Sequence, residues 1–191
     1  MKLGNYKHLK AVFPDTAVSE EEVLQTLKQM QIRHSLLIPV PHAPENHRKR
    51  ILQPLDDEFA KDFSEFDTLA ALKNSIFEQI SERKEETAQE ALCDALLTQI
   101  IEDSVLKLNP ETLSDLTSFL SPEEAERQLQ ETMVLHAVAE AEHLTLSEEE
   151  IAYAEEEGND KDEIEGLKLE LLCSKAMEWI LASADITEEQ I

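Results

Sequence analysis

The sequence TLAALKNSIFEQISERKEETAQEALCDALLTQIIEDSV, at residues 68–105, carries an apolar side chain at about every third or fourth position. The repeating positions are Leu69, Leu72, Ile76, Ile80, Ala88, Leu92, Leu96 and Ile100. Because an α-helix turns once in about 3.6 residues, these side chains form one stripe and predict a long helix from about Leu69 to about Val105. Residues 82–87 lack apolar side chains, which indicates a solvated span or a bend between two packed ends.

Helix-capping sequences mark three further helix starts. Ser19, Ser121 and Ser147 are each followed three residues later by a glutamate, the capping-box arrangement in which two side chains bond two backbone N–H groups reciprocally. Asn109-Pro110 begins a short element. The apolar spacing after these starts, and after the turn at residues 158–160, predicts helices at about 19–34, 122–143, 148–157 and 162–184.

The composition favours an all-α fold. The chain has only three glycines, and its stretches rich in Ala, Glu, Leu, Lys and Gln have good intrinsic helix propensity. Residues 6–13 form the one segment that resembles a strand, and a single short strand without a partner would be marginally stable.

Prolines gather in one segment. Four of the seven, Pro39, Pro41, Pro44 and Pro54, fall there, together with the basic run at residues 47–50. Proline fixes φ, removes a backbone donor and disfavours helix in the residue before it. We therefore predict an irregular connector from about Pro39 to Pro54, joining two helical portions.

The chain is strongly acidic, with 42 Asp and Glu against 17 Lys and Arg and a formal net charge of −25. This charge opposes binding to nucleic acid and to anionic membranes, and we expect neither as a partner. It keeps exposed helix faces soluble, and it would also attract basic clients. The N-terminal residues have no apolar signal-peptide core, and no run approaches the roughly 18 apolar residues of a membrane span, so a cytoplasmic location is expected.

Sequence patterns of enzyme chemistry are absent. The chain has no nucleophile elbow, no phosphate-binding glycine loop and no zinc pattern, so we predict no catalytic residue, no metal site and no cofactor. The acidic cluster at residues 56–58 could supply paired carboxylates, but a turn is the commoner meaning of such a cluster. Cys93 and Cys173 lie in apolar helical patterns and are expected to be buried, reduced thiols.

Two sets of side chains resemble metal ligands. A helix face carries His136, Glu140 and His143, although a metal would need ligands that the sequence does not supply, and an exposed polar face explains the set better. A weaker set in the connector consists of His42, Glu45 and His47.

Three segments resemble the C-terminal domain of the trigger factor family, and they occur in the family's order. PLDDEFAKDF at residues 54–63, with EFDTL at 65–69, resembles the opening of that domain. VLHAVAEAE at 134–142, with LSEEEI at 146–151, resembles its second-arm region. LELLCSKAM at 169–177, with ADITE at 184–188, resembles its last helix and tail.

The resemblance extends to the N-terminal part and implies a domain organisation. Residues 1–53 correspond to a linker segment with a helix at about 19–34 and the Pro-rich connector, and residues 54–191 to the helical chaperone domain. The implied fold is all-α, of the trigger factor C-terminal, SurA-like peptide-binding kind. Because residues 110–122 pass quickly to the next helix, shortened arms are expected. The ribosome-docking loop has no counterpart and only residues 41–49 stand where an isomerase domain would be inserted, so neither ribosome docking nor isomerase activity is expected.

The resemblance further implies an ATP-independent holdase that binds unfolded, partly folded or nascent polypeptides on exposed apolar surface. A helical adaptor that binds one dedicated partner, or a second copy in a homodimer, is the alternative. The candidate polypeptide-binding residues, chosen near arm ends and the linker edge, are Met30, Ile32, Leu36, Leu37, Phe119, Leu120 and Met133.

Overall fold

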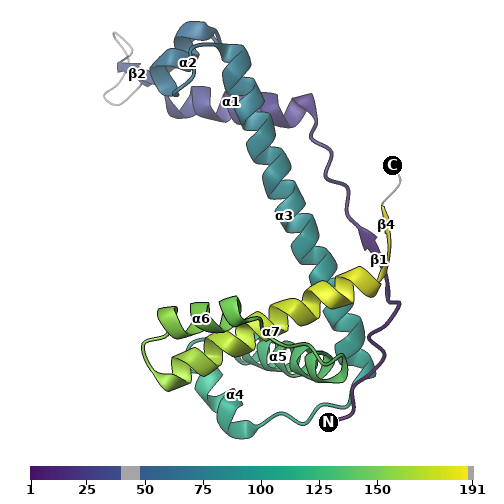
Figure 1. Ribbon diagram of the computed structural model, residues 1–191. Helices are drawn as coiled ribbons and strands as arrows, with labels where there is room; N and C mark the ends of the chain where they lie inside the picture. The colour runs from purple at the N-terminus through teal and green to yellow at the C-terminus, as the bar shows by residue number, and fades with distance from the viewer. Residues whose placement is uncertain (40–47, 189–191) are drawn as a thin grey trace. The chain divides into compact units, whose positions relative to one another are not determined.

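The computed structural model describes residues 1–39 and 48–188 (Figure 1). These residues form seven helices and four strands of four residues each, which confirms the all-α class. The chain packs as two compact units. Unit 1 contains residues 1–14 and the chain from Gln89 onward, and unit 2 contains Asp15–Ala88.

The long helix predicted from the apolar repeat is α3, Leu69–Asp103, and its residues belong to both units. Its N-terminus is capped twice, because Thr68 Oγ1 accepts from the Ala71 backbone N–H at 3.2 Å and Asp57 Oδ1 accepts from that of Leu69 at 2.8 Å. The apolar stripe packs as predicted, with Leu72 and Ile76 buried in unit 2 and Leu92 among the buried residues of unit 1. Residues 82–87 remain helical.

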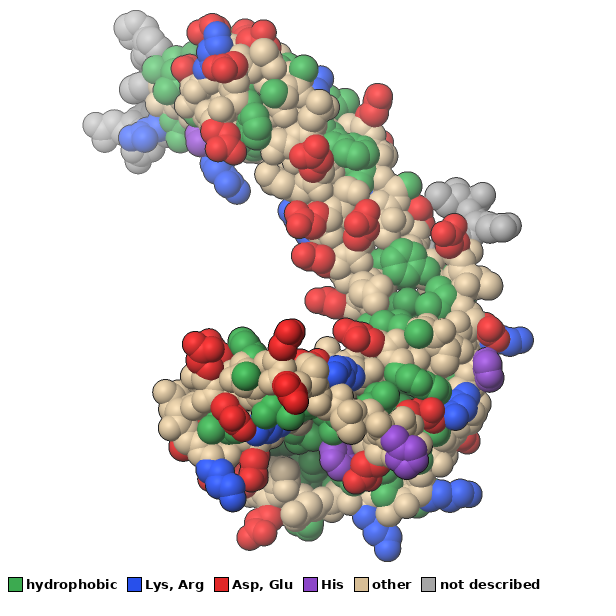
Figure 2. Space-filling view, viewed as in Figure 1, with side chains coloured by type: hydrophobic (Ala, Val, Ile, Leu, Met, Phe, Trp, Pro, Cys, Tyr) green, Lys and Arg blue, Asp and Glu red, His purple; other side chains and the backbone are tan. Residues whose placement is uncertain are grey.

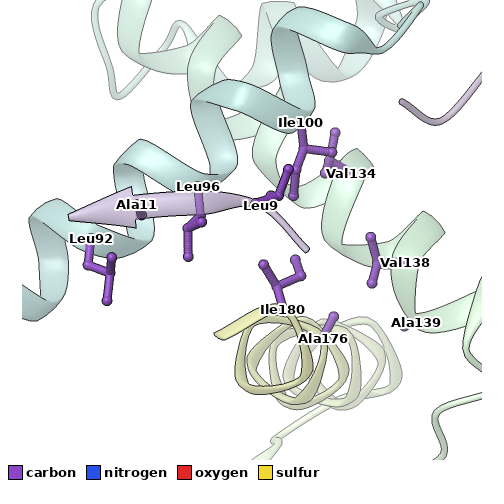
Figure 3. Packing of buried hydrophobic residues seen from close by; sticks show 10 residues of the cluster. All are labelled: Leu9, Ala11, Leu92, Leu96, Ile100, Val134, Val138, Ala139, Ala176 and Ile180. Atoms are coloured by element: carbon purple, nitrogen blue, oxygen red, sulfur yellow. The ribbon is translucent and has the colours of Figure 1, made fainter. Parts of the chain in front are cut away.

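Unit 1 is a helical body held by one hydrophobic core. After α3 it contains α4 (Pro110–Leu116), α5 (Pro122–Ala141), α6 (Glu148–Glu157) and α7 (Lys161–Ser183), and α7 packs on both α5 and α6. Figure 3 shows side chains from the N-terminal segment, α3, α5 and α7 meeting in this core. The ten buried residues are Leu9, Ala11, Leu92, Leu96, Ile100, Val134, Val138, Ala139, Ala176 and Ile180.

The first residues of the chain are part of unit 1. Strand β1 (Lys10–Phe13) pairs in parallel with β4 (Asp185–Glu188), with Lys10 opposite Asp185. Nearer the N-terminus, Gly4 donates its backbone N–H to Ser104 Oγ at 2.9 Å, beside the end of α3. Residues 6–13 were expected to be a marginal strand without a partner, and the tail of the chain supplies that partner.

Unit 2 contains α1 (Glu20–Arg33), β2 (Leu36–Pro39), β3 (Arg48–Ile51), α2 (Asp57–Phe63) and the first turns of α3. Its separate core consists of Val23, Leu27, Phe59, Ala60, Leu72 and Ile76. The capping boxes predicted at Ser19, Ser121 and Ser147 are all formed, with both reciprocal bonds present.

The prediction of an irregular connector is wrong for its described residues. Although Pro39–Pro54 contains no helix there, β3 pairs antiparallel with β2 and makes a hairpin, in which Leu36 lies opposite Ile51. Pro39 is compatible with this pairing, because it is the last residue of β2 and proline is tolerated on edge strands. The two packing units also differ from the predicted boundary between residues 53 and 54, but that boundary concerned family likeness and stays a prediction.

Candidate polypeptide-binding surface

Most of the exposed large apolar side chains of unit 2 lie where α1 ends and the β2–β3 hairpin begins. Three predicted residues belong there: Ile32 is 44% exposed, Leu36 59% and Leu37 52%. The structure adds three that the sequence analysis missed: Ile38 in β2, Ile51 opposite Leu36 in β3, and Leu52 directly after β3. The group, called here the hairpin patch, consists of Ile32, Leu36, Leu37, Ile38, Ile51 and Leu52.

One hydrogen bond joins the base of the hairpin to α1, and one ring contact joins the end of α1 to α2. Gln31 Nε2 donates to the backbone oxygen of Gln53 at 2.6 Å, which joins the last turn of α1 to the residues after β3. The ring of His34, the C-cap of α1, lies 4.5 Å from that of Phe63 in α2, measured between centroids. The exposed apolar side chains are therefore carried on a hairpin whose base contacts α1.

The two faces of the hairpin differ in chemistry. Residues directly opposite each other in an antiparallel pair share a face, and successive residues alternate between faces. Leu36, Ile38 and Ile51 therefore lie on one face together with Lys49, and this face is mainly apolar. The other face carries Leu37 opposite Arg50, with Arg48 two residues along, and it is mainly cationic.

The hairpin is basic within an acidic chain. Arg48, Lys49 and Arg50 are exposed, and Arg33 adds a further exposed cation in the last turn of α1. Within residues 1–39 and 48–188, none of these four side chains forms an ion pair. In Figure 2, which has the same view as Figure 1, basic and apolar side chains adjoin at the end of unit 2 where β2 is labelled. An anionic ligand at this end of unit 2 would meet these four cations.

The remaining predicted residues do not join the hairpin patch. Met30 is half-buried against the core of unit 2. Phe119 and Leu120 follow α4 in unit 1, where Phe119 is 89% exposed and Leu120 is half-buried. Met133 is half-buried in the middle of α5. Of the seven predicted residues, Ile32, Leu36, Leu37 and Phe119 are exposed as a binding surface requires.

Phe119 lies in acidic surroundings. Glu111 and Asp115 precede it on α4, Glu123 and Glu124 follow it at the start of α5, and residues 110–126 contain no Lys or Arg. The charge beside this exposed ring is thus opposite to that beside the hairpin patch. Acidic side chains are also spread over much of the face visible in Figure 2.

Sequence reasoning missed a second apolar feature of unit 2. A groove of about 310 Å³ lies between α1 and α3, and its apolar lining includes the exposed Leu24 and Phe77. Leu24 directly follows the buried Val23, and Phe77 directly follows the buried Ile76. In the sequence, an apolar helix face wider than the core requires would have indicated this groove. Polar residues complete the lining: Glu20, Lys73 and Asn74.

Ion pairs brace the helices that carry these surfaces. Lys84 Nζ lies 2.8 Å from a carboxylate oxygen of Glu22, and this ammonium, with the Ser19 cap, lowers the pKa of Glu22 to about 2. In unit 1, Lys175 and the Ser147 cap lower the pKa of Glu150 to about 2. These carboxylates are structural, because each is bound by a cation and by a helix N-terminus.

The polar candidates for chemistry serve as helix caps or stay dispersed. The cluster at residues 56–58 begins α2 and is not the predicted turn: Asp56 Oδ1 accepts from the Phe59 backbone N–H at 3.0 Å, and Asp57 caps α3. Among the described residues, no group of three or more His, Cys, Asp or Glu could hold a metal ion. His136 Nδ1 is 4.0 Å from Glu140 Oε2, and the set in the connector lies outside the described residues.

Cys93 and Cys173 are free thiols, as predicted, and they are half-buried, so the expectation of burial holds only in part. Burial raises the pKa of both, which keeps them in the unreactive thiol form. In the part of the chain that the structure describes, no helix has both the length and the apolar character needed to cross a bilayer.

Comparison with curated proteins returns trigger factors. The chain is 29% identical to the trigger factor of Clostridium botulinum (strain Alaska E43 / Type E3), over 79% of this chain and 40% of the relative. The chain is 26% identical to the trigger factor of Halothermothrix orenii, over 94% of this chain and 50% of the relative. It is 24% identical to the trigger factor of Caldicellulosiruptor saccharolyticus, over 100% of this chain and 51% of the relative. No family model matches the chain. The resemblance predicted from the sequence is confirmed, and the chain spans about half the length, or less, of these relatives.

Proposed function

Starting from the similarity to trigger factors, we propose that this chain is a cytoplasmic chaperone that binds unfolded, partly folded or nascent polypeptides without ATP. The observation that carries the proposal is the exposure of large apolar side chains in an otherwise charged surface, at the hairpin patch and at Phe119. Covering such side chains with the apolar residues of a client releases water and is favourable, while the surrounding charge keeps the complex soluble.

The proposal assigns binding, not bond chemistry, to the chain. Only residues 40–47 separate β2 from β3, at the place where the resemblance predicts an isomerase domain to be inserted. We therefore expect no acceleration of cis–trans exchange in a proline peptide. Measurable acceleration by the folded protein would refute this part of the proposal.

The net charge of −25 should also favour clients that combine basic and apolar residues, most directly at Phe119 and its acidic neighbours. Raising salt from physiological strength to about 1 M shortens the screening length from about 8 Å to about 3 Å and leaves apolar burial intact. Basic clients should therefore lose affinity with salt, and neutral apolar clients should not.

The test is suppression of aggregation of several unrelated unfolded proteins without nucleotide. Phe119→Ser should weaken suppression, and the fold should survive because the ring is 89% exposed. Ser118→Ala, at the adjacent position, is the control and should change little. If the folded protein protects none of the clients but binds one partner, or itself, in fixed stoichiometry, the adaptor function replaces the chaperone function.

A further inference from the structure

We propose that the β2–β3 hairpin binds extended polypeptide segments in which acidic and apolar residues alternate, and that such a segment adds to the hairpin as a third strand. This inference rests on the proposed function, because it names the class of client segment that one surface takes. The hairpin should prefer acidic segments, whereas the surface around Phe119 should prefer basic ones.

The hairpin offers free backbone edges. Within the described residues its sheet contains β2 and β3 alone, so each strand is paired along one side only. The N–H and C=O groups of such an edge are a template for another extended chain. A two-stranded sheet is marginally stable by itself, and a third strand would extend its hydrogen bonding.

The side chains of the hairpin determine which residue types the third strand should contain. One face of the hairpin presents Leu36, Ile38 and Ile51 together with Lys49, and the opposite face presents Arg48 and Arg50 together with Leu37. Successive side chains of an added strand would point to these two faces in turn. Next to β3, the acidic side chains of an added strand would lie beside Arg48 and Arg50 on one face. Its apolar side chains would lie on the other face beside Ile51, with the apolar residues of β2 one strand further.

Local charge complementarity supports an acidic segment in spite of the net charge of −25. The hairpin cations form no ion pair within the described residues, so an incoming carboxylate need not displace a partner among those residues. At physiological ionic strength, charges more than about 8 Å away are largely screened. The cations that touch the segment should then outweigh acidic residues on distant elements.

The experiment measures binding of short fluorescent peptides to the full chain by anisotropy. The first peptide alternates glutamate with valine, and the second has the same composition in two blocks. The first should bind more tightly, because only alternation sends all carboxylates to one face. A third peptide, alternating lysine with valine, should bind more weakly than the first at the hairpin.

Two variants of adjacent residues separate the faces. Arg50→Ser and Lys49→Ser each remove one exposed cation, but Arg50 lies on the cationic face and Lys49 on the apolar face. For the alternating acidic peptide, Arg50→Ser should weaken binding about three- to fivefold and Lys49→Ser less than about twofold, as expected for exposed ion pairs. The difference should shrink as salt rises.

Equal affinity for the alternating and blocked peptides, or equal loss in both variants, would overturn the proposal. So would a single-stranded RNA that competes as well as the acidic peptide, because the site would then recognise anions of any kind. If unrelated unfolded proteins still bind while the acidic peptide does not, this inference fails and the chaperone function stands. If neither binds, both fail.

Discussion

At the scale of single residues, Gly4 determines how closely the N-terminal segment approaches the end of α3. A Cβ built at this position would lie 2.6 Å from the backbone carbon of Asp103, closer than side chains tolerate. We expect Gly4→Ala to destabilise unit 1 by about 1–3 kcal/mol, the usual cost of overpacking. Urea unfolding followed by the fluorescence of Trp179, the only tryptophan of the chain, measures the change.

Gly166 provides the control for this substitution. It lies within α7, and a Cβ there would meet no atom within 4 Å. Gly166→Ala should therefore stabilise the protein by about 0.5–1 kcal/mol, because alanine loses less conformational freedom in a helix. A loss of stability of the same size in both variants would mean that close approach is not the reason for glycine at position 4.

At the scale of elements, the sequence predicted the helices, because interactions between residues close in the chain determine where they begin and end. A capping box joins residues three apart, and a helical stripe repeats every three or four residues, so α1, α3 and α6 were found nearly to their ends. Strands β1 and β4 could not be paired in advance, because each has four residues and its partner lies at the other end of the chain. The hairpin was missed because its prolines suggested a connector.

The candidate surface was also predictable only where local position along the chain determines exposure. Position near a helix end or in a connector correctly suggested exposure for Ile32, Leu36, Leu37 and Phe119. Position along the chain did not predict that Met30 packs on the core of unit 2, because this depends on which face of α1 points toward that core. The position of Ile51 opposite Leu36 follows only from strand register, which no local pattern specified.

The end of α5 offers a prediction at this scale. His143 has a φ of 55°, and the bonds from its N–H to Glu140 O and from the Leu144 N–H to Ala139 O complete a Schellman motif. Left-handed backbone costs an L-residue about 1–2 kcal/mol and glycine little. His143→Gly should therefore raise the free energy of unfolding by up to about 1 kcal/mol, measured by urea titration.

His136, in the middle of the same helix, is the matched control. His136→Gly replaces a helical residue with glycine and should lower stability by a few tenths of a kcal/mol to about 1 kcal/mol. Opposite signs for the two variants would identify backbone conformation as the cause. A stability loss at position 143 would instead indicate that the imidazole itself contributes at the helix end.

At the scale of the whole molecule, two effects of charge oppose each other as pH falls. The net charge of −25 makes the folded protein repel itself, and protonation of carboxylates towards the pI near 4.4 relieves this repulsion. Glu22 and Glu150 act in the other direction, because their folded pKa values of about 2 lie below the ordinary glutamate value of 4.5. A lowered folded pKa contributes stability above the unfolded pKa, and this is lost as pH falls towards the folded value.

We therefore predict that stability holds or rises slightly from pH 7 to about 4.5 and then falls between about 4.5 and 2. Urea unfolding at fixed ionic strength across this range provides the curve, with circular dichroism reporting both units and Trp179 reporting unit 1. Glu150→Gln should flatten the acid limb in both signals, whereas Glu22→Gln, in unit 2, should flatten it mainly in circular dichroism. Because both ion pairs are partly open to solvent, added salt should reduce their effect. An acid limb of unchanged slope in both variants would show that other groups cause the loss of stability.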